Sequence, residues 1–204
     1  MRRAAAAAVL VGAWLAAGAP STAQGRSPAD VHGAEQRFAS AASGLRRDLS
    51  RFKDLPPEAQ ERLRDVQFVY RRSARPEARP EYRFGAVQVT VSDGWMVLAE
   101  QLLGASLLSN ADCGQDYLRA VAEVERANRR LTAEGRRKGL RAWPLLREHL
   151  ERSDNQACRG DAIRELRLPR HTDAVAVGLD AALAWTILRQ LATLPCTLPR
   201  SEER

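Results

Sequence analysis

The sequence predicts a mainly α (α+β) protein: one helical domain of five to seven helices with a small two-stranded antiparallel sheet. Three observations predict this class. Apolar residues recur every three or four positions over most of the chain, as they do on the buried stripe of a helix. They alternate in only two short segments, which is the period of a strand. The 204-residue length suits a single domain with its own core.

Residues 1–23 have the three parts of a secretory signal peptide. Arg2 and Arg3 supply the positive start, an apolar run follows over residues 4–17, and small residues precede a cleavage site near Ala23. The run is shorter than the roughly 20 residues that a membrane-spanning helix needs, which favours a cleaved signal over a retained anchor. We therefore expect an exported, soluble protein, periplasmic or secreted, whose single domain covers residues 24–204.

The first helix of the mature chain is predicted to begin at Ser27-Pro28-Ala29-Asp30, a cap followed by a first-turn proline and an acid. It is predicted to run for about 24 residues, until Pro56-Pro57 ends it. Packing on its own domain is favoured over a partner-binding coiled coil, because only about three heptads are present. Residues 58–64 predict a short second helix. The apolar positions of the first helix are Val31, Ala34, Phe38, Ala41, Leu45, Leu49 and Phe52.

Apolar residues alternate over residues 66–70 and again over residues 87–91, which predicts two strands of one antiparallel sheet. The connection between them, residues 71–83, holds five arginines and two prolines as well as glutamates. Such a segment is either an anion-binding arm or an ordinary mobile connection, and its prolines and glutamates favour the second interpretation.

Four further helices are predicted after the strands, over residues 95–103, after Cys113, over residues 139–150 and over residues 158–168. The strongest pattern of the mature chain is the terminal helix, residues 172–194, where Thr172 can cap the start and Pro195 stops the end. Its wide apolar stripe makes it the expected centre of the core. This stripe consists of Val175, Leu179, Leu183, Ile187 and Leu191.

Three cysteines, Cys113, Cys158 and Cys196, follow the signal segment. One disulfide is expected in an oxidising compartment, with one thiol left over. The pair Cys113–Cys158 is favoured, because both residues sit in polar, turn-like sequence at the two ends of a helical pair. Cys196 follows the terminal helix and remains an alternative partner for either of them.

Charge indicates the kind of partner. Without Arg2 and Arg3, 30 basic residues face 25 acidic ones, which gives a net charge of about +5. The arginines are interspersed with acids along the predicted helices, a pattern typical of a solvated, ion-paired surface. The sequence leaves the partner unknown: an anionic envelope surface and a protein partner are both compatible with this charge, and nucleic acid is not expected.

Residues that carry catalysis are not found in any recognisable arrangement. The sequence contains no phosphate-binding glycine loop, nucleophile elbow or CxxC pair. The acids that flank His149 fan out around a predicted helix and do not converge on one point. His171 is expected in the cap region of the terminal helix. No catalytic, cofactor-binding or metal-binding residue is therefore assigned.

Residues 187–194 resemble the metal helix of HExxH zinc metallopeptidases of the bacterial envelope. In that family two histidines one turn apart bind zinc, and the glutamate between them is the general base. Residues 87–95 look like the edge strand, turn and helix start that precede this helix. Arg189, Gln190 and Thr193 stand at the first-ligand, base and second-ligand positions. Arginine stays protonated and cannot bind zinc, so the resemblance implies a relative without hydrolase activity.

These observations favour a non-catalytic exported protein that acts as a binding or accessory module through contact. The alternative is a relative of the zinc metallopeptidases, inactive because the HExxH residues are replaced.

Overall fold

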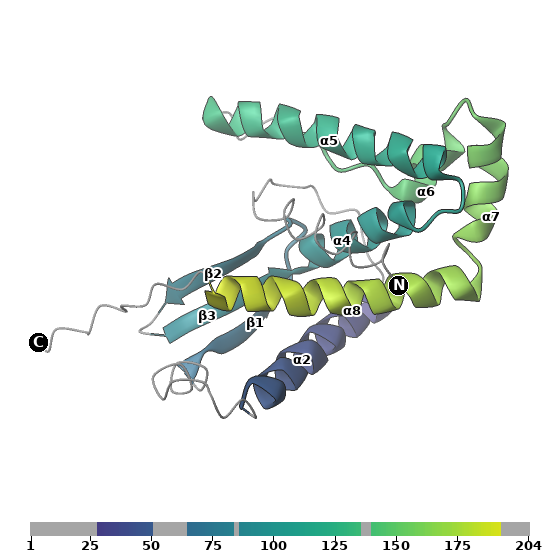
Figure 1. Ribbon diagram of the computed structural model, residues 1–204. Helices are drawn as coiled ribbons and strands as arrows, with labels where there is room; N and C mark the ends of the chain where they lie inside the picture. Colours follow the sequence, from purple (N-terminus) through teal and green to yellow (C-terminus); the bar gives the residue numbers. More distant parts are fainter. Residues whose placement is uncertain (1–27, 51–64, 84–85, 136–139, 193–204) are drawn as a thin grey trace, which may run out of the picture.

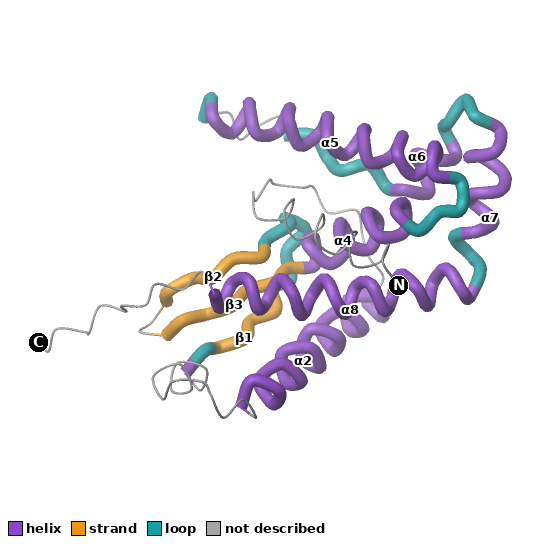
Figure 2. Tube along the Cα trace, in the orientation of Figure 1, coloured by secondary structure: helices purple, strands orange, loops and turns teal. Residues whose placement is uncertain are grey.

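The computed structural model describes residues 28–50, 65–83, 86–135 and 140–192 (Figures 1 and 2). Within these residues six α-helices and one π-helical turn accompany a three-stranded sheet, which confirms the mainly helical class. The predicted signal segment, the predicted helix over residues 58–64 and Cys196 lie outside the described residues. The elements are α2 (Pro28–Ser50), β1 (Gln67–Arg71), β2 (Ala78–Arg83), β3 (Ala86–Ser92), α4 (Asp93–Ser106), α5 (Ala111–Ala133), α6 (Leu146–Glu151), η1 (Cys158–Ala162), α7 (Ile163–Glu165) and α8 (Pro169–Ala192).

The sheet differs from the predicted antiparallel pair. Its order is β1-β3-β2, with β1 parallel and β2 antiparallel to the central strand β3. The two predicted strands, β1 and β3, are therefore parallel neighbours, and a third strand comes from the arginine-rich connection. This arrangement is possible because two parallel strands need a long connection, and the connection here forms β2.

The two faces of the sheet differ in polarity. Phe68 lies opposite Val89 and Tyr70 opposite Val91, so these four side chains share one face. Both valines are fully buried, and the ring of Phe38 on α2 lies 5.7 Å from that of Tyr70. The opposite face carries Arg71 of β1 and Arg79 and Glu81 of β2.

Helix α8 lies at the centre of the fold, as its apolar stripe predicts (Figure 1). It packs beside α2 and against α4, β2 and β3. Leu183 and Ile187 are fully buried. Gly178 allows close packing, because a Cβ there would lie 3.2 Å from Leu103 of α4. By length and composition α8 could also cross a membrane, although 44% of its most apolar window is buried in this domain.

Helix α8 begins at Pro169, three residues before the predicted cap. Proline is favoured in a first turn, where its missing N–H costs nothing. Thr172 is helical and does not cap; its hydroxyl donates to the carbonyl of Pro169 at 2.9 Å.

The helix predicted over residues 139–150 is reduced to α6, Leu146–Glu151. Residues 140–145 are not helical, because buried side chains of α5 bind their backbone. Asn128 exchanges two hydrogen bonds with Arg141, of 2.9 and 2.8 Å, and the Tyr117 hydroxyl donates to the Pro144 carbonyl at 2.9 Å.

Cys113, in the first turn of α5, is bonded to Cys158 at the start of η1. The Cα atoms are 5.5 Å apart, and both residues are buried. This bond is the predicted one, and it joins the start of α5 to the helical turn that follows α6.

Candidate functional site

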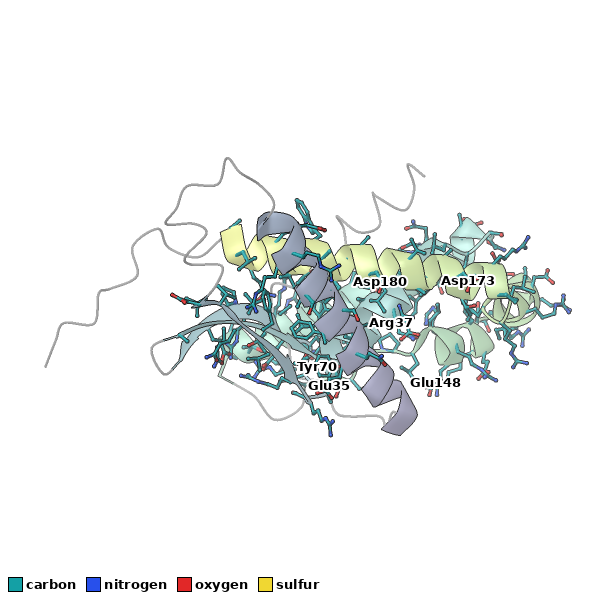
Figure 3. The ribbon with its side chains drawn as sticks, turned by 90° about the horizontal axis from the view of Figure 1, so that it is seen from below. Glu35, Arg37, Tyr70, Glu148, Asp173 and Asp180 are labelled. Atoms are coloured by element: carbon teal, nitrogen blue, oxygen red, sulfur yellow. A yellow bond between two sulfur atoms is a disulfide. The ribbon has the colours of Figure 1, made fainter. Side chains whose placement is uncertain are left out.

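A groove lies between α2 and the outer edge of β1. Its volume is about 1100 Å³, and Phe38 and Ala42 of α2 line it together with Phe68 and Tyr70 of β1. Phe38 and Ala42 are buried, whereas both ends of the groove are charged. Figure 3 shows Tyr70 and Glu35 close together where α2 crosses the sheet.

Strand β1 is an edge strand: among the described residues it pairs with β3 alone. Its other edge faces α2, because Arg46 of α2 donates to the Val66 carbonyl at 2.6 Å. Backbone groups alternate in direction along a strand, so the N–H and C=O groups of Phe68 and Tyr70 are expected to point to this edge as well. An edge of this kind presents donors and acceptors to a further strand.

The other edge of the sheet is protected in two ways. Pro80 lies in the middle of β2, where it cannot donate a hydrogen bond to a further strand. Arg79 and Glu81 add an ion pair of 2.7 Å. Charges and proline are the usual devices that prevent pairing at an edge. The sequence of β1, Gln-Phe-Val-Tyr-Arg, contains no proline.

The two ends of the groove are held by polar contacts. At one end the Arg46 guanidinium lies 4.9 Å from the centre of the Phe68 ring. At the other end the Tyr70 hydroxyl donates to the carboxylate of Asp93, the first residue of α4. Arg72 pairs with Glu35 at 3.0 Å, and this carboxylate raises the pKa of the Arg72 guanidinium. The two contacts from α2, made by Arg46 and Glu35, hold this helix near both ends of β1.

The arginines of the connection between β1 and β3 form ion pairs with glutamates of the same segment. Arg71 bonds to Glu77 at 3.0 Å and to Glu81 at 3.1 Å, and Arg75 lies 3.6 Å from Glu77. The two glutamate side chains are about nine-tenths buried, with 11% and 10% exposed. The arginines therefore balance carboxylates of the same segment, which does not favour an anion-binding arm.

Two of the three positions singled out by the metallopeptidase resemblance lie in the described part of α8. Arg189 is exposed on α8. Gln190 is buried, and its side-chain amide donates to the Thr90 carbonyl at 3.4 Å. Thr193 lies outside the described residues. The strand that the resemblance makes an edge strand, β3, is central. Within the part of the chain that the structure describes, no three His, Cys, Asp or Glu side chains gather as metal ligands would.

His149 and His171 both contact acidic side chains of neighbouring elements. His149 Nε2 lies 2.9 Å from a carboxylate oxygen of Asp116, and its ring meets the edge of Tyr117. The side chain of His171 is only 4% exposed, with Nδ1 3.9 Å from Glu165. Burial lowers the pKa of His171, while Glu165 acts in the opposite direction.

Sequence reasoning did not find the groove. The apolar spacing of Phe38 and Ala42 and the alternation of Phe68 and Tyr70 were visible separately. Their meeting depends on β1 lying at the edge beside α2, which neither pattern specifies. No family model, curated protein or solved structure matches this chain, so the site rests on its geometry.

Proposed function

We propose that this protein is an exported, non-catalytic binding module that docks an extended segment of another protein along β1, in the groove beside α2. One observation carries the proposal: among the described residues the outer edge of β1 pairs with no further strand and lies beside a groove, whereas β2, at the opposite edge, carries Pro80 in its middle. Addition of a strand to an exposed edge, with pockets for alternate side chains, is a common way to bind peptides.

The strand length limits the ligand. β1 has five residues, so about five residues of a partner could pair with it, roughly 17 Å of extended chain. Side chains on one side of the added strand would meet the half-buried apolar side chains of Phe68 and Tyr70, which line the groove. Main-chain hydrogen bonds would supply affinity and this surface would supply selectivity.

The charges of the groove favour a protein over a polyanionic surface. Arg46 and Arg47 line it, but Glu35 and Asp65 do so as well. Two positive and two negative groups give no net charge, so a phosphate-rich surface would gain little from this site. A peptide can use both signs together with the apolar wall.

The test uses two tryptophan substitutions on α2. Ser43 lines the β1 groove, and Ser40 lines a separate surface hollow between α2 and α8; both are exposed. Peptides are selected from a displayed library of random ten-residue segments on the purified protein, and their affinities are measured by fluorescence polarisation. We expect Ser43→Trp to weaken binding at least tenfold and Ser40→Trp to leave it within twofold.

Hydrogen exchange gives the second readout. A selected peptide should slow exchange of the backbone amides of Phe68 and Tyr70, because strand addition engages that edge. If the library yields no binder, or if the binders leave β1 exchange unchanged and tolerate Ser43→Trp, the proposal is wrong.

A further inference from the structure

Arg46 of α2 reaches the edge of β1 and lines the groove between them. Two contacts hold its guanidinium: the hydrogen bond of 2.6 Å to the Val66 carbonyl, and the Phe68 ring, whose centre lies 4.9 Å away. The residue is nevertheless exposed. A long side chain loses rotamer freedom when it is held in one place, and here this loss occurs before any ligand binds. Arg46 therefore presents a fixed positive group to a chain that enters the groove.

Within the part of the chain that the structure describes, Arg46 has no acidic partner. Arg37, nine residues earlier on the same helix, differs in this respect, because it pairs with Asp180 at 3.1 Å. A guanidinium carries five N–H donors in an arrangement that suits the two oxygens of a carboxylate. The hydrogen bond to the Val66 carbonyl leaves donors of Arg46 for a ligand.

Strand pairing determines which residue of a ligand would meet Arg46. Residues directly opposite each other on paired strands point to the same face of the sheet, and successive residues alternate between faces. Phe68 and Tyr70 share the face on which Phe38 of α2 packs. A ligand residue opposite Phe68 would place its side chain beside the ring that Arg46 contacts. The ligand residue opposite Tyr70 would lie two positions away.

We propose that the groove is specific for segments that carry Asp or Glu two residues from an apolar residue, with the acidic side chain bound by Arg46 and the apolar one packed beside Tyr70. This inference rests on the proposed addition of a strand to β1, and it defines which segments bind there. The spacing holds for both directions of the added strand, because the positions opposite Phe68 and Tyr70 are two residues apart in either case.

The extent of the groove assigns the acidic group to a side chain. The groove continues beyond Val66 to Asp65, so a bound chain has room to run past Arg46. A chain that ended here would bring its terminal carboxylate close to the carboxylate of Asp65, and like charges across an interface disfavour binding. We therefore expect an internal segment of the partner protein as the ligand.

The experiment takes peptides that were selected on the purified protein and synthesises them with acetylated and amidated ends, which removes the terminal charges. Fluorescence polarisation measures their affinities for the unchanged protein and for two variants that each lose one positive charge from α2. Arg37 is the matched control, because it is exposed and lines the separate hollow between α2 and α8. We expect Arg46→Gln to weaken binding at least fivefold and Arg37→Gln to change it less than twofold.

Changes in the peptide give a second readout that leaves the protein untouched. Replacing the acidic residue of the peptide by its amide should weaken binding to the unchanged protein at least fivefold. The same replacement should change binding to Arg46→Gln less than twofold, because the two groups act as a pair. This readout on the unchanged protein decides the matter even if circular dichroism shows that Arg46→Gln is unfolded.

The outcomes separate this inference from the proposed function. Peptides that slow exchange along β1 but have no acid at this spacing, or that tolerate its replacement, would leave strand addition standing and overturn the inference. Equal losses in Arg46→Gln and Arg37→Gln would also overturn it, since the attraction would then be general. Binding that requires a free carboxyl end would overturn it by assigning Arg46 to a chain terminus. If the library yields no binder, the proposed function fails and this inference fails with it.

Discussion

Loss of the Cys113–Cys158 bond should remove a large part of the stability of this domain. The bond closes a loop with a sequence separation of 45 residues. The chain-entropy relation gives about 13 cal/mol/K for such a loop, or roughly 4 kcal/mol at 25 °C. Small domains are stable by only about 5–15 kcal/mol. Reduction of this bond is therefore expected to leave a folded protein with a much lower free energy of unfolding.

The assay is urea unfolding followed by circular dichroism, in a Cys196→Ser background that prevents cross-linking. With a slope of about 2 kcal/mol per M urea, the midpoint should fall by roughly 2 M on reduction. The double variant Cys113→Ala/Cys158→Ala should be at or below the reduced protein, because both sulfur atoms are also buried. A shift of less than about 0.5 M would refute the reasoning.

Three other outcomes are expected. Burial lowers the pKa of His171 in the folded state, so the neutral side chain contributes fully to stability above the unfolded pKa of about 6.5, and this contribution is lost as the pH falls through the lowered value. Urea unfolding at pH 7 and pH 5 should show this loss of stability. An equal loss in the His171→Gln variant would contradict the assignment to His171. Gly114→Ala should lower the free energy of unfolding by more than about 2 kcal/mol, because the added Cβ would lie 2.2 Å from the Ala105 carbonyl oxygen. Gly33→Ala, whose Cβ would have nothing within 4 Å, should leave the melting temperature unchanged or raise it. Similar melting temperatures for the two variants would show that the α4–α5 contact can relax. Elemental analysis should find no stoichiometric zinc, because Arg189 cannot bind it; one bound equivalent would instead support a metallopeptidase.

Helical periodicity and turn chemistry were enough to predict α8 as the core helix and Cys113 with Cys158 as the disulfide. Both depend on local patterns: an apolar stripe in one case, and polar residues beside each cysteine in the other. The residue types were sufficient because neither prediction required knowing which strands are neighbours.

The sheet required that knowledge, and there the prediction failed. Alternation marks a strand without naming its partner, so β1 and β3 were paired in the wrong sense. Strand β2 was missed because Pro76, Pro80 and the charged residues around them are typical of a connection. An edge strand tolerates such residues, since one side of its backbone need not pair. The groove beside β1 exists only in the correct strand order, which is why sequence patterns could not reveal it.

The neighbours of α8 also determine when this chain can fold. Helix α8 closes over Leu103 of α4, and its Asp180 pairs with Arg37, which lies 143 residues earlier. A chain that emerges from its N-terminus, on the ribosome or through a membrane, must release almost all of its length before these contacts can form. Such long-range closure slows folding. In the exported protein proposed above, late completion of the core would keep the chain unfolded during transport until its last helix is released.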